Sequence, residues 1–123
     1  MKIAISSTGK TLEDNVDMRF GRCPYFLIVD IEDEEVKDVK AVENPNVSVG
    51  GGAGVSAGEL VGNEKVKAVI TINLGPKAMG IMQQLGIEVY KGEGKIKDVV
   101  KKFIAGKLEK VSDATGPQHM GLK

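Results

Sequence analysis

The stretch Val66-Lys67-Ala68-Val69-Ile70-Thr71-Ile72 decides the fold, because it is the strongest predicted strand in the chain. The turn Asn73-Leu74-Gly75 follows it, and Pro76 is suited to the first turn of a helix. That helix ends at Gly86 and carries apolar residues at helical spacing, namely Ala78, Met79, Ile81, Met82 and Leu85. A strand that leads into a helix in this way is typical of an α/β domain.

The same alternation of strands and helices extends in both directions from this stretch. We expect a short helix over Val55–Val61, a strand over Ile87–Tyr90 and an amphipathic helix over Ile96–Ile104. Residues 7 to 24 are expected to form a long loop that Pro24 closes. The N-terminal third otherwise predicts three strands, which are Lys2–Ser6, Tyr25–Ile31 and Val36–Val42.

The order of these elements predicts a mixed five-stranded sheet with helices on both faces. The first three strands are expected to form an antiparallel meander, whereas the last two must run parallel because each is reached through a helix. The predicted strand order is therefore 3-2-1-4-5. The connections diverge between strands one and four, so a crevice is expected at their carboxyl ends. Ser6–Gly9 and Asn73–Pro76 would both line this crevice.

Length and charge limit the classes of function. The 123 residues include seventeen basic and seventeen acidic ones, and this balance argues against nucleic acid or an anionic membrane as a partner. We expect one α/β domain over residues 1–108 and a polar tail over residues 109–123. No apolar run approaches the roughly 20 residues of a membrane span, and the start does not predict a signal peptide. The sequence therefore predicts a cytoplasmic protein.

Side chains that usually carry catalysis are scarce. One cysteine, Cys23, excludes an internal disulfide framework and an all-thiolate metal cage built from one chain. The one histidine, His119, lies in the expected tail, where we expect it to be solvated. Paired carboxylates, a Ser/His/Asp set and metal-ligand spacing are missing from the sequence. We therefore expect the protein not to be an enzyme.

The first candidate site is the segment Arg19-Phe20-Gly21-Arg22-Cys23, which holds both arginines of the chain beside its one thiol. Two guanidinium groups would lower the pKa of the thiol and favour a thiolate that could bind a metal. They would also suit a bidentate grip on an anion. The alternative is that Cys23 is a small buried residue at the entrance of a strand and that the arginines are surface charges.

The second candidate is the glycine-rich loop around Gly51, Gly52 and Gly54, whose backbone amides could face an anion at the start of a helix. The spacing from Gly52 to Ala57 matches a dinucleotide fingerprint, but no buried strand precedes it. The alternative is a flexible linker. The turn at Asn73 and Gly75 is a third candidate, because glycine allows a ligand to approach the backbone and a helix begins there.

As a set and in this order, these segments resemble the nitrogenase iron–molybdenum cofactor biosynthesis domain family. The resemblance runs from Lys2 to about Leu108. It is carried by the start Lys2–Ser7, by Arg19–Phe26, by Glu43-Asn44-Pro45, by Gly51–Gly54, by Val66–Ile72, and by Gly75-Pro76 with Gly86-Ile87. The family fold is a mixed five-stranded sheet of the ribonuclease H-like motif type, and the sequence lacks the acidic set that nuclease activity would need.

The resemblance implies binding, transfer or storage of an iron–sulfur or iron–molybdenum cluster rather than turnover. In cofactor-carrying members a histidine precedes the Phe-Gly of the first motif, and that position is Arg19 here. Cys23 is then the one soft metal ligand nearby. We expect Arg19, Arg22, Cys23 and the amides of the glycine loop to hold the cluster, with cluster-donor or cluster-acceptor proteins as partners. The alternative function is a small-anion or nucleotide-phosphate binding module, and a thiol-dependent enzyme is a second alternative. The sequence leaves the oligomeric state open.

Overall fold

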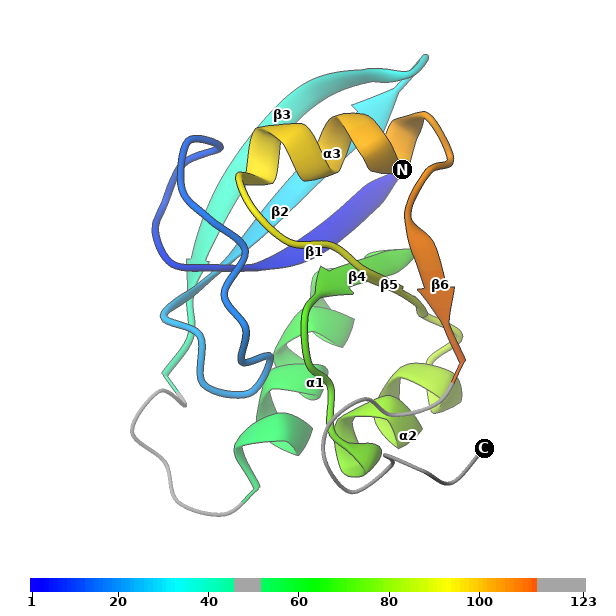
Figure 1. Ribbon diagram of the computed structural model, residues 1–123. Helices are drawn as coiled ribbons and strands as arrows, with labels where there is room; N and C mark the ends of the chain where they lie inside the picture. The colour runs from blue at the N-terminus through cyan, green and yellow to red at the C-terminus, as the bar shows by residue number, and fades with distance from the viewer. Residues whose placement is uncertain (46–51, 113–123) are drawn as a thin grey trace.

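The computed structural model describes residues 1–45 and 52–112, and no helix within these ranges is both long and apolar enough to cross a membrane. Strands and helices alternate along the chain, as Figure 1 shows. The elements are β1 (Lys2–Ser7), β2 (Tyr25–Glu32), β3 (Glu35–Glu43), α1 (Ala53–Asn63), β4 (Ala68–Thr71), α2 (Pro76–Gln84), β5 (Glu88–Lys91), α3 (Ile96–Ile104) and β6 (Glu109–Val111).

The sheet confirms the predicted topology and adds a strand to it. β2 pairs antiparallel with β1 and with β3, whereas β4 is parallel to β1 and to β5. The observed order is β3-β2-β1-β4-β5-β6, so the predicted order 3-2-1-4-5 is right and the sheet of the described residues has six strands instead of five. β6 pairs antiparallel with β5 at the outer edge.

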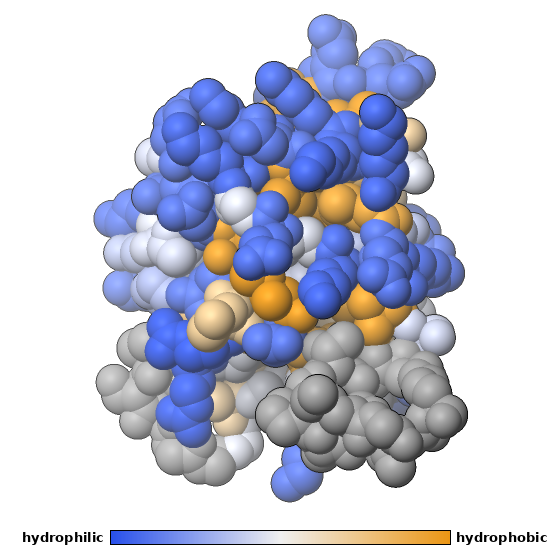
Figure 2. Space-filling view, viewed as in Figure 1, coloured by the Kyte–Doolittle hydropathy of each residue, from blue (hydrophilic) through white to orange (hydrophobic). Residues whose placement is uncertain are grey.

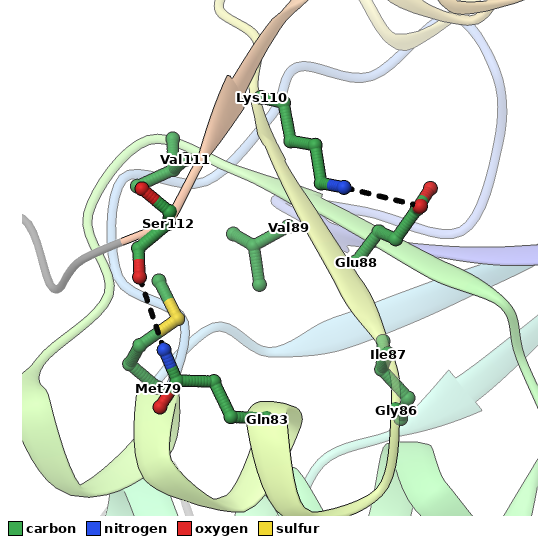
Figure 3. Close-up of a pocket in the computed structure, with 9 residues that line it drawn as sticks. All are labelled: Met79, Gln83, Gly86, Ile87, Glu88, Val89, Lys110, Val111 and Ser112. Carbon is green, nitrogen blue, oxygen red and sulfur yellow. Dashed lines mark hydrogen bonds and ion pairs between the residues drawn. The ribbon is translucent and has the colours of Figure 1, made fainter.

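The sixth strand lies in the segment that we expected to begin the polar tail. Two side-chain contacts hold it: Gln83 Nε2 on α2 donates to the carbonyl oxygen of Ser112 at 3.0 Å, and Lys110 pairs with Glu88 of β5 at 3.2 Å (Figure 3). Three residues with one apolar side chain give no strand pattern of their own, so pairing with β5 creates this strand. Residues 113–123, including His119, lie outside the described residues.

Alternate residues of the strands supply two separate halves of the core. On β1, Ala4 faces α1 and α2, whereas Ile3 and Ile5 face α3, as expected from the twofold alternation of a strand. Figure 1 shows α3 alone across one face of the sheet, with α1 and α2 on the other side. The sheet is therefore buried on both faces at its centre, and the central strands β1, β2 and β4 are buried along most of their length.

Glycines bring α1 and α2 into close contact. A Cβ atom built on Gly58 would lie 3.1 Å from the Cγ2 atom of Ile81, and one built on Gly62 would lie 2.7 Å from the Cδ1 atom of Leu85. At the start of the two helices, a Cβ atom on Gly54 would lie 3.5 Å from the Cβ atom of Ala78. The close approach along the helices therefore sets their N-termini side by side.

Candidate functional site

A cleft of about 170 Å³ opens where the N-termini of α1 and α2 meet the loop before β2. It lies just beyond the carboxyl end of β4, which is the position at which open α/β sheets bind ligands. The residues that line it are Phe20, Gly21, Gly52, Gly54, Val55, Asn73, Gly75, Pro76, Lys77 and Ala78. Parts of the three segments that the sequence singled out separately thus meet around one cleft, whereas the expectation that Ser6–Gly9 would also line it is wrong.

The structure brings together most of the residues that the sequence analysis proposed. Phe20, Gly21, Gly52, Gly54, Asn73 and Gly75 line the cleft. Neither arginine lines the cleft: Arg19 forms a parallel backbone bridge with Asn73 but lines a neighbouring hollow with Asp17, and Arg22 is half-buried in the same loop. Gly51 lies outside the described residues.

The two helix N-termini at the cleft have no side-chain cap and no acidic residue in the first turn. Backbone amides in the first turn of a helix have no acceptor within the helix, and they carry partial positive charge. Lys77, in the first turn of α2, adds a full positive charge to the lining. Lys77 was not predicted as a site residue, although its position one residue after Pro76 indicates the first turn of a helix.

The third helix, α3, differs from α1 and α2 because its N-terminus has hydrogen-bond acceptors. The amides of Ile96 and Lys97 donate to the carbonyl oxygens of Asp14 and Leu12, at 2.9 and 3.0 Å, and Asp98 lies in its first turn. Loop carbonyls and an acidic side chain therefore neutralise the N-terminus of α3. Such partners are missing at α1 and α2 within residues 1–45 and 52–112, and both of these helices begin at the cleft.

Two contacts fix the loop before β2, which forms the third wall of the cleft beside the starts of α1 and α2. A Cβ atom on Gly21 would lie 2.9 Å from the amide nitrogen of Gly54, so the loop backbone rests directly on the start of α1. The buried side chain of Asn44 donates through Nδ2 to the carbonyl oxygens of Gly21 and Cys23, at 3.1 and 2.8 Å. This role of Asn44 was not predicted from the sequence, because its partners lie more than twenty positions away.

Arg19 is oriented by a buried carboxylate. Asp17 accepts hydrogen bonds from the backbone amide of Arg19 at 2.8 Å and from its Nε atom at 3.2 Å, and this contact raises the pKa of Arg19. The hydroxyl of Ser6 donates to the carbonyl oxygen of Asp17 at 2.8 Å and lies 2.8 Å from the hydroxyl of Thr71. The carboxyl ends of β1 and β4 are thereby joined to the loop that carries Arg19.

Cys23 is a residue of the core. Its side chain is fully buried, packs in the same cluster as Phe20 and Phe26, and donates to the carbonyl oxygen of Phe20 at 3.5 Å. Burial raises the pKa of the thiol from its usual value near 9 to about 12. The expectation that the arginines would lower this pKa is wrong, because Arg19 is more than half exposed and binds Asp17 instead.

Metal-binding side chains do not gather elsewhere in the part of the chain that the structure describes. Residues 1–45 and 52–112 contain no group of three or more histidine, cysteine, aspartate or glutamate side chains that could hold a metal ion. The donors that the cleft offers are instead N–H groups of the backbone and the Lys77 ammonium group. Such donors favour an anion over a bare metal cation.

A second cavity, of about 200 Å³, lies between α2, β5 and β6 (Figure 3). Its lining includes Gly86 and Ile87, which precede β5, so it opens at the amino ends of the parallel strands. Met79 and Val89 reach into it from α2 and β5, and both are almost fully buried. Because the functional edge of such sheets is the carboxyl edge, this cavity is not the candidate site.

Taken together, the fold and the cleft define a small α/β domain with a cleft, lined by two helix N-termini without side-chain caps, at the carboxyl edge of its sheet. The chain belongs to the family described as dinitrogenase iron-molybdenum cofactor, which it matches over residues 1–106. The resemblance drawn from the sequence is thereby confirmed. Membership of this family indicates a cofactor-related accessory role.

Individual relatives match this chain along most of their length. The protein MJ0580 of Methanocaldococcus jannaschii, which is uncharacterized, is 40% identical over 111 residues, covering 89% of this chain and 91% of that protein. The apo form of the orange protein from Desulfovibrio gigas has a TM-score of 0.84 and 26% identity, covering 94% of this chain and 96% of that one. The crystal structure of MJ0327 from M. jannaschii has a TM-score of 0.75 and 31% identity, covering 92% and 96%.

Proposed function

We propose that this protein is a non-enzymatic carrier or accessory protein that binds an anionic iron–sulfur or iron–molybdenum type cluster as cargo in the cleft. The observation that carries the proposal is the meeting of two uncapped helix N-termini with Lys77 around a glycine-lined cleft. Family membership supplies the class of cargo. The cleft supplies the charge, because the first-turn amides and the ammonium group all favour a negative ligand.

The shape of the cleft fits a ligand that approaches the backbone. Gly75 has extended backbone dihedral angles that any residue can adopt, and a Cβ atom on it would meet no protein atom within 4 Å. The fold itself therefore does not require glycine at this N-cap position. A side chain there would occupy the space in front of the first-turn amides of α2, which a bound anion needs.

The geometry favours hydrogen bonding to the outer atoms of the cluster over direct ligation of its metals. Sulfide ligands at the surface of a cluster can accept hydrogen bonds from backbone N–H groups. Cys23, which we expected to be the metal ligand, is buried and keeps its proton to about pH 12, so the proposal no longer relies on it. Arg19 remains in the proposal as a charged group beside the cleft, because its backbone pairs with Asn73, and Arg22 remains as a neighbour in the same loop.

Anaerobic reconstitution with iron and sulfide tests this function. We expect the wild-type protein to retain iron after desalting and to show visible absorbance, and we expect Cys23→Ala to do the same. Gly75→Asp places a carboxylate at the N-cap of α2 and should abolish retention. Loss of iron from every protein alike, together with a rise in melting temperature with a nucleotide, would favour the nucleotide-phosphate alternative instead.

A further inference from the structure

A basic hollow lies on the face of the sheet that carries α3, on the side opposite to α1 and α2. It measures about 420 Å³ and is formed by the end of β5, by α3 and by the start of β6. The residues that line it are Lys91, Gly92, Glu93, Val99, Lys102, Lys107, Leu108 and Glu109. None of these residues takes part in the cleft described above.

The charge of this region departs from the neutrality of the whole chain. Residues 91 to 110 contain seven lysines and three acidic residues, which gives a net charge of +4 in a chain whose net charge is zero. Lys97 pairs with Glu13 and Lys110 pairs with Glu88. In contrast, the three lysines that line the hollow form no ion pair with any carboxylate of the described residues. Their charge is therefore available to a partner.

The floor of the hollow is apolar and tightly packed. Val99 is almost fully buried, Leu108 is partly buried, and a Cβ atom on Gly92 would lie 2.7 Å from a methyl group of Val99. Figure 2 shows hydrophobic residues at the centre of this face with hydrophilic ones around them. Lysines around an apolar floor fit a ligand that carries both carboxylates and apolar groups.

We propose that the basic hollow docks an acidic segment of a partner protein, the one that delivers the cargo to the cleft or receives it. This inference rests on the proposed function, because a carrier must meet a donor and an acceptor. The lining favours a peptide over a nucleic acid because it offers neither arginine nor an aromatic ring for base contacts, whereas its apolar floor can receive apolar side chains.

The test uses the unloaded protein and a defined probe, a twelve-residue peptide of four Glu-Glu-Leu repeats. Amide chemical shifts should change at Gly92, Lys102 and Lys107 during the titration, and the affinity should fall as salt is raised. Lys102→Glu combined with Lys107→Glu should weaken binding about tenfold or more. The matched control is Lys2→Glu with Lys65→Glu, which reverses two exposed lysines outside the hollow and should change the affinity less than about twofold.

Several results would overturn the inference. Equal weakening in both double variants would show that only net charge matters, and shift changes confined to another face would place the contact elsewhere. Tighter binding of a twelve-base-pair DNA duplex than of the peptide would reverse the choice of partner. Because the peptide titration needs no cargo, its failure is distinct from a failure of cluster binding. The Lys102→Glu/Lys107→Glu variant should also retain iron like the wild type, since the cleft is intact.

Discussion

The backbone of Gly21 rests on the amide of Gly54, so closely that a Cβ atom on Gly21 would lie 2.9 Å from the Gly54 nitrogen. This contact joins the loop that carries both arginines to the first turn of α1. Since the loop and the helix start form two walls of the cleft, the width of the site depends on this approach. The close backbone contact therefore requires glycine at position 21, whereas the fold leaves room for a side chain at position 75.

The first prediction concerns the contact at Gly21. Gly21→Ala should lower the free energy of unfolding by about 1–3 kcal/mol, because the new methyl group pushes against backbone atoms that cannot rotate away. Urea denaturation measures the change. Gly80→Ala is the control, because a Cβ atom there meets nothing within 4 Å, and it should stabilise the exposed face of α2 by up to about 1 kcal/mol. Equal effects of both variants would contradict the contact.

The second prediction separates stability from binding at Gly75. Gly75→Asp and Gly75→Ser each provide a side-chain cap for α2 where none exists, so neither should destabilise the fold, and each could add a few tenths of a kcal/mol. Both should weaken the retention of cargo, the aspartate more strongly because it also repels an anion. Thermal unfolding and iron analysis on the same samples check this. Unchanged iron content in the aspartate variant would show that the cargo lies elsewhere.

The third prediction concerns the reactivity of the thiol. Since Cys23 is fully buried and its pKa is raised to about 12, iodoacetamide at pH 8 should alkylate the folded protein far more slowly than the protein in 6 M guanidinium chloride. Mass spectrometry of timed samples gives both rates. Rapid alkylation of the folded protein would restore Cys23 as an accessible metal ligand.

The fourth prediction is the dependence of stability on pH that follows from the same group. The folded protein holds the Cys23 proton to about pH 12, whereas the unfolded chain releases it near pH 9. The contribution to stability is therefore complete below pH 9 and is lost as the pH rises toward 12, by at most about 1.4 kcal/mol per pH unit. The free energies of unfolding of the wild type and of Cys23→Ala, measured between pH 7 and 11, isolate the contribution of the thiol. Parallel curves for the two proteins would contradict it.

The fifth prediction concerns Asn44, which holds the loop of Arg19 and Arg22 in place. Asn44→Ala leaves the carbonyl oxygens of Gly21 and Cys23 without this donor in a buried position, which should cost about 1–3 kcal/mol. Urea denaturation measures the loss. Asn15→Ala, at an exposed loop position, should change the free energy of unfolding by less than about 0.5 kcal/mol.

The sequence was sufficient for those parts of the fold that local pattern determines. The apolar runs predicted five strands, and the helix over Ile96–Ile104 has the predicted bounds because its apolar spacing and the glycine that follows it are local signals. The strand Glu109–Val111 was missed, since its order comes from pairing with β5 and from the contact between Gln83 and Ser112. Such tertiary contacts leave no mark in a window of three residues.

The backbone positions that form the candidate site could be predicted from the sequence, whereas the roles of its side chains were missed. Glycines and a proline mark where a chain turns, so Gly21, Gly54 and Gly75 could be found from the sequence. The error over Cys23 has a different origin: neighbours in sequence do not determine burial, and burial controls the pKa of a thiol. Asn44 escaped notice because the backbone groups it binds are distant in the chain.

The most direct test of the central claim is an amide NMR titration of the unloaded protein with tetrathiomolybdate, a dianionic metal–sulfur complex, under anaerobic conditions. The largest shift changes should fall on the first-turn amides of α1 and α2, at Gly54, Val55, Lys77 and Ala78, in the wild type and in Cys23→Ala alike. Gly75→Asp should abolish them. If the changes gather around Cys23, or if these four amides do not respond, the anion cleft is not where this protein holds its cargo.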